Sequence, residues 1–116
     1  MERPCTGRGD GRVVGALDVS LREGGEWAYV DNSCVSSAHR RQCIASALVA
    51  AAADVASDWG ARDLFAHVVR GNTPAELCYA KSGFSDASAN VGVHVLVLRG
   101  NPALPPGARL IGRPLP

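Results

Sequence analysis

This sequence has few aromatic residues and almost no excess of charge of either sign. Aromatic side chains make up 5% of its 116 residues, and 12 basic residues are balanced by 11 acidic ones, for a formal net charge of +1. A nearly neutral chain without a basic, aromatic stripe has little bulk charge with which to bind nucleic acid or a membrane surface. The composition therefore predicts neither kind of partner.

The sequence also lacks a metal-binding pattern and a long apolar run. None of its four cysteines, Cys5, Cys34, Cys43 and Cys78, shows C-x-x-C spacing, so we expect no metal site, and reduced thiols rather than disulfides. No run of about 18 apolar residues and no apolar leader occurs, which predicts neither a membrane span nor a signal peptide. The expected location is intracellular, cytoplasmic by default, with an organelle left open.

The sequence contains enough strand and helix patterns for one domain, and 47% of its residues are hydrophobic. Strands are expected at residues 13–21, 27–35, 64–69 and 91–98, and helices at residues 41–58 and 74–81. The glycine-rich turn at 23–26 makes the first two strands a hairpin, and the helix between the second and third strands makes those two parallel. We therefore predict a mixed α/β sheet with the order β-β-α-β-α-β, in which Gly60 and Gly83 end the two helices.

The two ends of the chain differ in composition from its middle. Residues 1–12 are polar and glycine-rich, and residues 100–116 carry five of the seven prolines. Such segments bury too little apolar surface to offset the entropy of ordering them. We predict a disordered segment at 1–12, a folded domain at 13–99 and an extended or disordered tail at 100–116.

A basic segment joins the second predicted strand to the first predicted helix. Arg40 and Arg41 precede that helix, whose first N–H groups and dipole favour a bound phosphate. Neither the G-x-G-x-x-G pattern of dinucleotide-binding folds nor the P-loop pattern is present. Taken alone, the segment is equally well an exposed helix start with two solvated arginines.

A second motif, N-x-x-A-x-x-x-Y-x-K-x-G-F, covers residues 72–84. Thr73 is the expected N-cap and Pro74 suits the first helical position. The hydroxyl of Tyr79 can act as a general acid where a leaving group needs a proton. Taken alone, this motif describes a capped helix with a buried tyrosine and a glycine stop.

Together, in this order and spacing, the two motifs resemble the GCN5-related N-acetyltransferase (GNAT) family over residues 13–84. The resemblance implies a GNAT-like acyl-CoA N-acyltransferase fold, acetyl-CoA as cosubstrate, no metal, and direct transfer of an acetyl group to an amine in a ternary complex. It also implies that backbone N–H groups from Arg41 to Ser46 hold the pyrophosphate and that the strand end at Cys34 and Val35 pairs with the pantetheine arm. The implied cofactor-binding residues are Cys34, Val35, Arg40, Arg41, Gln42, Cys43, Ile44, Ala45, Ser46, Asn72 and Tyr79.

The same resemblance assigns catalytic roles. Tyr79 would protonate the departing CoA thiolate. Asp31 is the candidate general base and His67 a second one, although a solvated strand carboxylate and a satisfied core histidine are the plainer interpretations of these two residues. The acceptor is an amine whose type stays open: a protein N-terminus, a lysine, a polyamine or a small molecule.

Two departures from the family pattern shape the alternatives. Cys43 stands where the family has glycine, whose missing Cβ lets the backbone approach phosphate closely. Family members also begin with a strand and two helices that form much of the acceptor wall, so this chain is predicted to be N-terminally truncated, with an exposed sheet edge that a second copy or a partner would cover. The alternative function is a non-catalytic GNAT remnant that binds CoA weakly or serves as an interaction domain.

Overall fold

A computed structural model describes residues 2–9, 12–22, 25–35, 44–100, 104 and 107–116 of the chain. Three strands come first, and helices and strands then alternate. In chain order they are β1 (Glu2–Gly9), β2 (Arg12–Arg22), β3 (Trp27–Val35), α1 (Ile44–Asp58), β4 (Asp63–Val69), α2 (Thr73–Lys81), β5 (Ser85–Asp86), α3 (Val91–Gly100) and β6 (Ala108–Pro114).

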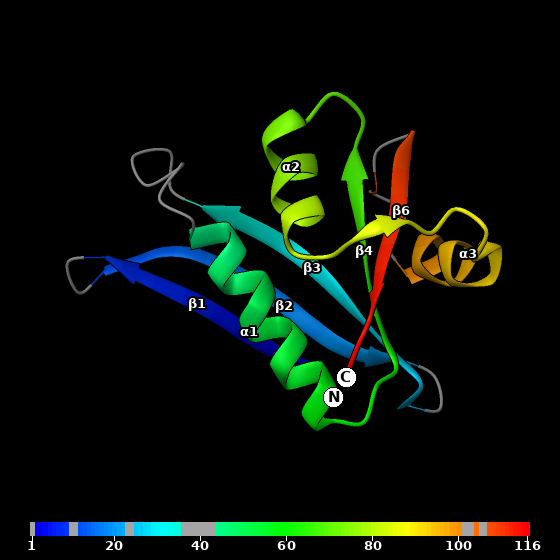
Figure 1. The fold of residues 1–116 in the computed structure, drawn as a ribbon, viewed down its shortest axis with the longest axis horizontal. Helices are drawn as coiled ribbons and strands as arrows, with labels where there is room; N and C mark the ends of the chain where they lie inside the picture. Colours follow the sequence, from blue (N-terminus) through cyan, green and yellow to red (C-terminus); the bar gives the residue numbers. More distant parts are fainter. Residues whose placement is uncertain (1, 10–11, 23–24, 36–43, 101–103, 105–106) are drawn as a thin grey trace.

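The strands form one six-stranded mixed sheet in the spatial order β1-β2-β3-β4-β6-β5 (Figure 1). Strands β1, β2 and β3 pair antiparallel in sequence, and α1 then crosses over so that β4 runs parallel to β3. Strand β6 enters between β4 and β5 and pairs antiparallel with both. The mixed α/β sheet and the central βαβ unit are confirmed, but the predicted element order is wrong: it is β-β-β-α-β-α-β-α-β.

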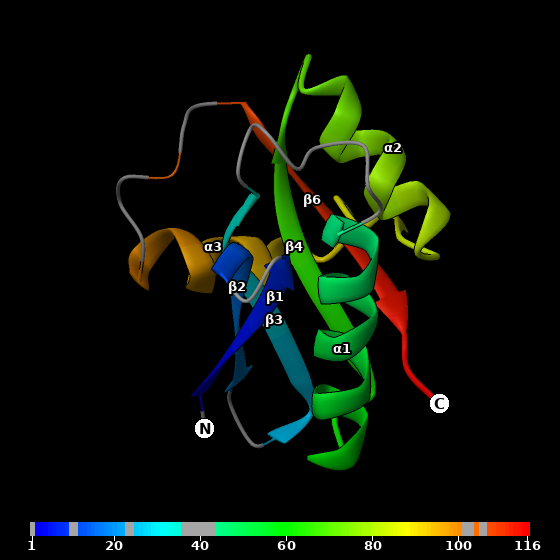
Figure 2. The ribbon, with the colours of Figure 1, turned by 90° about the vertical axis from the view of Figure 1, so that its left-hand side faces the viewer.

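The helices divide the sheet into two faces, with α1 and α2 on one side and α3 on the other (Figure 2). On the first face, Val30, Leu64 and Ala66 belong to an apolar core that also includes Leu48 and Ala52 of α1. The second face carries a smaller cluster with Val97 of α3 at its centre, and its members are Tyr29, Phe65, Ala87, Val97 and Leu110. Successive side chains of a strand point to opposite faces, which is why neighbours along β3 and β4 belong to different clusters.

Small side chains bring α1 close to the sheet. Ala52 and Ala56 have no exposed surface at all, and alanine combines high helix propensity with little bulk. The helix ends as predicted at Gly60, whose φ of 85° is costly for residues with a Cβ. The N–H of Ala61 donates to the carbonyl of Ala56 at 3.1 Å, which satisfies one of the last helical carbonyls.

The N-terminal segment is a strand, so the prediction of disorder over residues 1–12 is wrong for Glu2–Gly9. Strand β1 pairs with β2 from Glu2↔Ser20 to Gly9↔Arg12, and it covers the sheet edge that we expected to be exposed. Glycine and proline hide this strand from pattern analysis. Pro4 fits an outermost strand, because such a strand need not donate every N–H to a neighbour.

The segment predicted as a fourth strand, residues 91–98, is the helix α3. Val93 and Val97 lie four residues apart and pack against the second-face cluster, whereas Val91 and Val95 are exposed. Residues 91–98 are hydrophobic at six of eight positions, which satisfies both a two-residue and a 3.6-residue period, so the pattern did not distinguish the two structures. The correction matters because the helix carries His94 onto the second face.

The C-terminal tail is also structured. Residues 108–114 form β6, which pairs with β4 from Asp63↔Pro114 to Val69↔Ala108, so the tail predicted as extended or disordered is an extended sheet strand there. Leu110 and Ile111 are buried in different clusters, on opposite faces of the sheet. Two adjacent apolar residues were too short a signal to outweigh the surrounding prolines.

Candidate active site

The two central parallel strands separate from each other soon after they begin. Among the described residues, β3 and β4 pair only over Trp27↔Asp63, Ala28↔Leu64 and Tyr29↔Phe65. Strand β3 then continues to Val35 alongside β2, and β4 continues alongside β6, while their ends point apart (Figure 1). The resulting gap presents strand backbone to an extended ligand, in the way that a sheet edge accepts an added strand.

A bulge in β3 lies at this gap. The register with β2 changes from Asp18↔Asp31 to Ala16↔Cys34, so β3 uses one more residue than β2 over the same interval. A bulge of this kind bends the strand and redirects its backbone groups. Asp31 stands immediately before the bulge, on the second face with Tyr29.

The first turn of α1 and helix α2 bring parts of the two sequence motifs together beside the gap. The first turn of α1 contains Ala45 and Ser46 and follows the end of β3 (Figure 1). The Ser46 hydroxyl lies 3.5 Å from the Cys78 thiol of α2, one residue before Tyr79. The structure therefore joins the end of the first predicted motif, at Ser46, to the helix of the second.

Within α2, Asn72 and Tyr79 have structural contacts of their own. Asn72 rather than the predicted Thr73 is the N-cap, and its side-chain oxygen accepts a long hydrogen bond of 3.4 Å from the Ala75 N–H. Tyr79 is 8% exposed, and its ring meets that of Phe84 edge-on at 5.0 Å. The N–H of Phe84 donates to the Tyr79 carbonyl past Gly83, which ends the helix as predicted.

The other predicted cofactor-binding residues are only partly described. Arg40, Arg41, Gln42 and Cys43 lie outside the described residues. Ile44 is the first residue of α1, and the backbones of Cys34 and Val35 complete β3, paired with Ala16 and Gly15. The predicted basic turn thus stays a prediction, between two segments that the structure does describe.

A chain of hydrogen bonds that the sequence did not reveal crosses the second face. The Tyr29 hydroxyl lies 2.7 Å from Nδ1 of His67, and Nε2 of His67 lies 2.8 Å from Nδ1 of His94. Both ring nitrogens of His67 therefore have partners, so His67 is not free to act alone as the second candidate base. The pattern showed His67 but not its partners, because His94 was assigned to a strand.

His67 is held in its neutral form. Burial, and to a lesser extent the neighbouring His94, lower its pKa from 6.5 to about 4, and the carboxylate of Asp31 opposes both effects. A histidine with a pKa this low carries no charge at neutral pH. It can hand on a proton only while it receives another.

Tyr29 keeps its proton for similar reasons. Burial raises the pKa of Tyr29 above its ordinary value, and the negative charge of Asp31 and the electrostatic influence of Tyr79 act in the same direction, against Arg22 and the hydrogen bond with His67. The Arg22 guanidinium lies 5.8 Å from the centre of the Tyr29 ring. The four residues that act on the pKa of Tyr29 come from four elements, β3, α2, β2 and β4.

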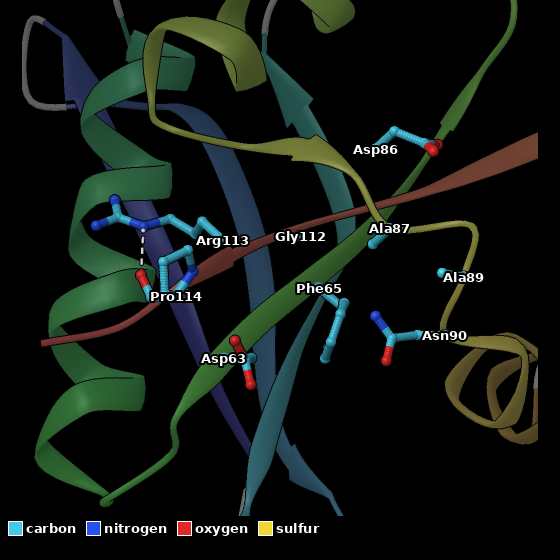
Figure 3. A pocket seen from close by; sticks show the side chains of 9 residues that line it. All are labelled: Asp63, Phe65, Asp86, Ala87, Ala89, Asn90, Gly112, Arg113 and Pro114. Carbon is cyan, nitrogen blue, oxygen red and sulfur yellow. Dashed lines mark hydrogen bonds between the residues drawn. The ribbon is translucent and has the colours of Figure 1, made fainter.

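Cavities open on the part of the chain that the structure describes. One, of about 240 Å³, lies at the start of β4, where Asp63, Asp86 and Asn90 surround Phe65 (Figure 3). It contains none of the predicted site residues. Another, of about 340 Å³, is lined by His94 together with Arg70, Ser88, Gly107, Ala108, Arg109 and Leu110.

The described residues show neither a metal centre nor a membrane-spanning helix. No group of three or more His, Cys, Asp or Glu side chains among them is arranged to hold a metal ion. No helix in this part of the chain has the length and apolar character needed to cross a bilayer.

Comparisons with known proteins agree with this geometry. A curated relative, the GCN5-related N-acetyltransferase 7, chloroplastic, of Arabidopsis thaliana, is 36% identical over 62 residues, which are 53% of this chain and 23% of that protein. The crystal structure of nourseothricin acetyltransferase superimposes with a TM-score of 0.78 at 25% identity, covering 99% of this chain and 66% of the other. The PaiA N-acetyltransferase of Thermoplasma acidophilum, in complex with coenzyme A, shares the fold with a TM-score of 0.75 at 12% identity, covering 97% of this chain and 60% of the other.

The chain thus spans less than a quarter of its curated relative, 23%, and about two thirds, 66%, of nourseothricin acetyltransferase. Residues 2–84 match the model of the acetyltransferase (GNAT) family. The match begins at β1 and ends at Phe84, so it includes the gap, both sequence motifs and α2. This chain belongs to the GNAT acetyltransferase family.

Proposed function

We propose that this chain transfers an acetyl group from acetyl-CoA to an amine, by direct attack of the amine within a ternary complex. The gap between β3 and β4 carries this proposal, because it lies between the first turn of α1 and the helix that holds Tyr79. A cosubstrate with a phosphate-rich end and an extended, amide-containing arm matches a helix N-terminus next to an unpaired strand.

The chain's own residues divide the binding task. Backbone N–H groups at Ala45 and Ser46, with Arg40 to Cys43 before them, hold the pyrophosphate, and the end of β3 at Cys34 and Val35 pairs with the pantetheine arm. The hydrogen bond of Asn72 with Ala75 orients the start of α2 beside the same gap. The bulge before Cys34 turns the strand backbone toward the gap, where an N–H can polarise the thioester carbonyl.

The proton transfers fall to Tyr79 and Asp31. Tyr79 donates its proton to the departing thiolate, for which a buried, protonated phenol is suited. Asp31 takes the proton of the attacking amine from its place before the bulge. The amine nitrogen then forms its bond to the acyl carbon as the carbon–sulfur bond breaks.

Two measurements test this function. Acetyl-CoA should raise the melting temperature of the wild-type chain, because a ligand that binds the folded state stabilises it. Tyr79→Phe should lower kcat by about 100-fold and leave the affinity for CoA nearly unchanged. An equal loss of turnover and of CoA affinity would make Tyr79 a structural residue, and no thermal shift at all would remove the cofactor claim.

A non-catalytic remnant that binds CoA weakly is the alternative, and Cys43 is the observation that favours it. A side chain in the glycine place crowds the phosphate turn. Cys43→Gly should therefore tighten CoA binding, which isothermal titration calorimetry would measure. Tighter binding without turnover in either protein would favour the remnant, whereas turnover by the wild-type chain would exclude it.

A further inference from the structure

We propose that Tyr29, His67 and His94 form a relay that carries the proton of the acceptor amine from the gap between β3 and β4 to the cavity beside α3. The inference rests on the proposed acetyl transfer, which releases one proton from the amine for every acetyl group moved. The family match covers only part of this route, because His94 lies on α3, beyond the matched residues 2–84.

The relay is continuous at the level of hydrogen bonds. Its two links, Tyr29 to His67 and His67 to His94, measure 2.7 Å and 2.8 Å, which are normal hydrogen-bond distances. Three separate elements, β3, β4 and α3, supply the three side chains. Because Tyr29 is only 2% exposed, the relay gives its hydroxyl a connection to the outside that its own surface does not.

The two ends of the relay lie in different surroundings. At the inner end, Tyr29 is the last residue of β3 that pairs with β4, and Asp31 follows it on the same face. The charge of Asp31 acts on the pKa of both Tyr29 and His67. At the outer end, His94 lines the cavity of about 340 Å³, which is large enough for several water molecules.

One set of protonation states lets a proton pass without leaving a charge on His67. The Tyr29 hydroxyl donates to Nδ1 of His67, and the Nε2–H of His67 donates to Nδ1 of His94. When Asp31 passes the amine proton to the Tyr29 oxygen, the original Tyr29 proton moves to Nδ1 of His67, and the proton of Nε2 moves to His94. His94 then releases the proton of its own Nε2 to water in the cavity.

This sequence of transfers balances. One O–H bond breaks and one forms at Tyr29, and one N–H bond breaks and one forms at each histidine. The carboxylate of Asp31 is restored, and the amine nitrogen keeps the electron pair with which it bonds to the acyl carbon. Neutral His67 and protonated Tyr29, the charge states that burial favours, are those with which the relay begins and ends, and each histidine finishes as its other neutral tautomer.

Exogenous imidazole provides the sharpest test. His94→Ala in the full chain removes the outer member of the relay and enlarges the cavity that it lines. We expect kcat for acetyl transfer from acetyl-CoA to spermidine, free lysine or a peptide N-terminus to fall by about 100-fold, with the KM for acetyl-CoA unchanged. Added imidazole, which fits the enlarged cavity, should restore most of the lost kcat.

Val93→Ala is the matched control, since Val93 is the neighbouring residue of α3 and is also half-buried. It removes packing but no proton carrier, so imidazole should not change its turnover. Wild-type turnover by His94→Ala, or a loss that imidazole does not restore, would overturn the relay while leaving the acetyl transfer standing.

An absence of acetyl transfer by the wild-type chain would instead remove the proposed function, and the relay is then judged by ¹⁵N NMR of the histidine rings. The charged or titratable groups that meet the relay are Arg22, Asp31 and Tyr79 at its inner end and Arg70 and Arg109 around the cavity. The relay predicts that His67 stays neutral well below pH 6, with both ring nitrogens hydrogen-bonded. Protonation of His67 near its ordinary pKa of about 6.5 would overturn it.

Discussion

The two faces of the sheet carry different kinds of side chain. The first face, under α1 and α2, is packed with aliphatic and alanine side chains such as Val30, Leu64 and Ala52. The second face, under α3, mixes aromatic rings with hydrogen-bonded polar groups, among them Tyr29 and His67. Apolar packing on the first face fixes the positions of the strands. Because the strands are fixed, the second face holds its polar groups at set distances.

The largest effect should come from truncating the first face. Leu64 has no exposed surface, so Leu64→Ala should lower the free energy of unfolding by about 2–5 kcal/mol through lost burial and the cavity left behind. Urea denaturation measures this change. Leu77→Ala, at a side chain that is 56% exposed on α2, is the control and should cost far less. Equal losses would mean that the first-face core is not the main source of stability.

Adding a methyl group to the second face should have the next largest effect. A Cβ on Gly112 would lie 2.7 Å from a ring carbon of Phe65, closer than carbon atoms approach without displacement. Gly112→Ala should destabilise the chain by about 1–3 kcal/mol, because the Phe65 ring is buried and must move. Thermal unfolding of Gly112→Ala and of Gly92→Ala, where nothing lies within 4 Å, provides the comparison. A neutral Gly112→Ala would show that the second face is loosely packed.

The cap of α2 should contribute less. Asn72→Ala removes the side-chain oxygen that accepts from Ala75 at 3.4 Å, and we expect a loss of about 1 kcal/mol or less, because the bond is long. Asn72→Ser keeps a capping oxygen and should recover part of the loss in the same denaturation experiment. If Asn72→Ala weakens CoA binding without changing stability, Asn72 contacts the cosubstrate, as the family resemblance implies.

The most selective effect concerns pH. The pKa of His67 falls from 6.5 to about 4 on folding, mainly through burial, so the unfolded chain binds more protons between these values and stability rises with pH there. The contribution of His67 is complete above about pH 6.5 and is lost as the pH falls toward 4. His67→Gln should reduce the difference in urea midpoint between about pH 7 and pH 5. An unchanged difference would show that His67 is accessible to solvent.

The same contrast explains how much the sequence could predict. Strands β2, β3 and β4 and helices α1 and α2 were all found from their apolar patterns, in which first-face residues such as Leu64 and Val68 recur. Glycines 60 and 83 mark the helix ends. Helix α3 and strand β6 were missed, because valines at every second position also satisfy a helix and because Leu110 and Ile111 form only a short apolar run. These elements are ordered by long-range contacts with the second face.

The candidate site also has a part that the sequence could predict and a part that it could not. The motif residues Asn72 and Tyr79 are recognisable from spacing along the chain, and the structure places them on one helix beside Ser46. The contact of Tyr29 with His67 spans 38 residues, and that of His67 with His94 spans 27. No local pattern encodes such contacts, since they depend on the crossover through α1 and on the position of α3.

The central claim is that the gap between β3 and β4 binds acetyl-CoA, and amide chemical shifts measured during an acetyl-CoA titration test it most directly. The account predicts the largest changes at the end of β3, from Val30 to Val35, and at Ala45 and Ser46 of α1, with little change around Asp63 and Asp86 at the other cavity. Unchanged amides at about 1 mM acetyl-CoA, or changes confined to the cavity at Asp63 and Asp86, would contradict it.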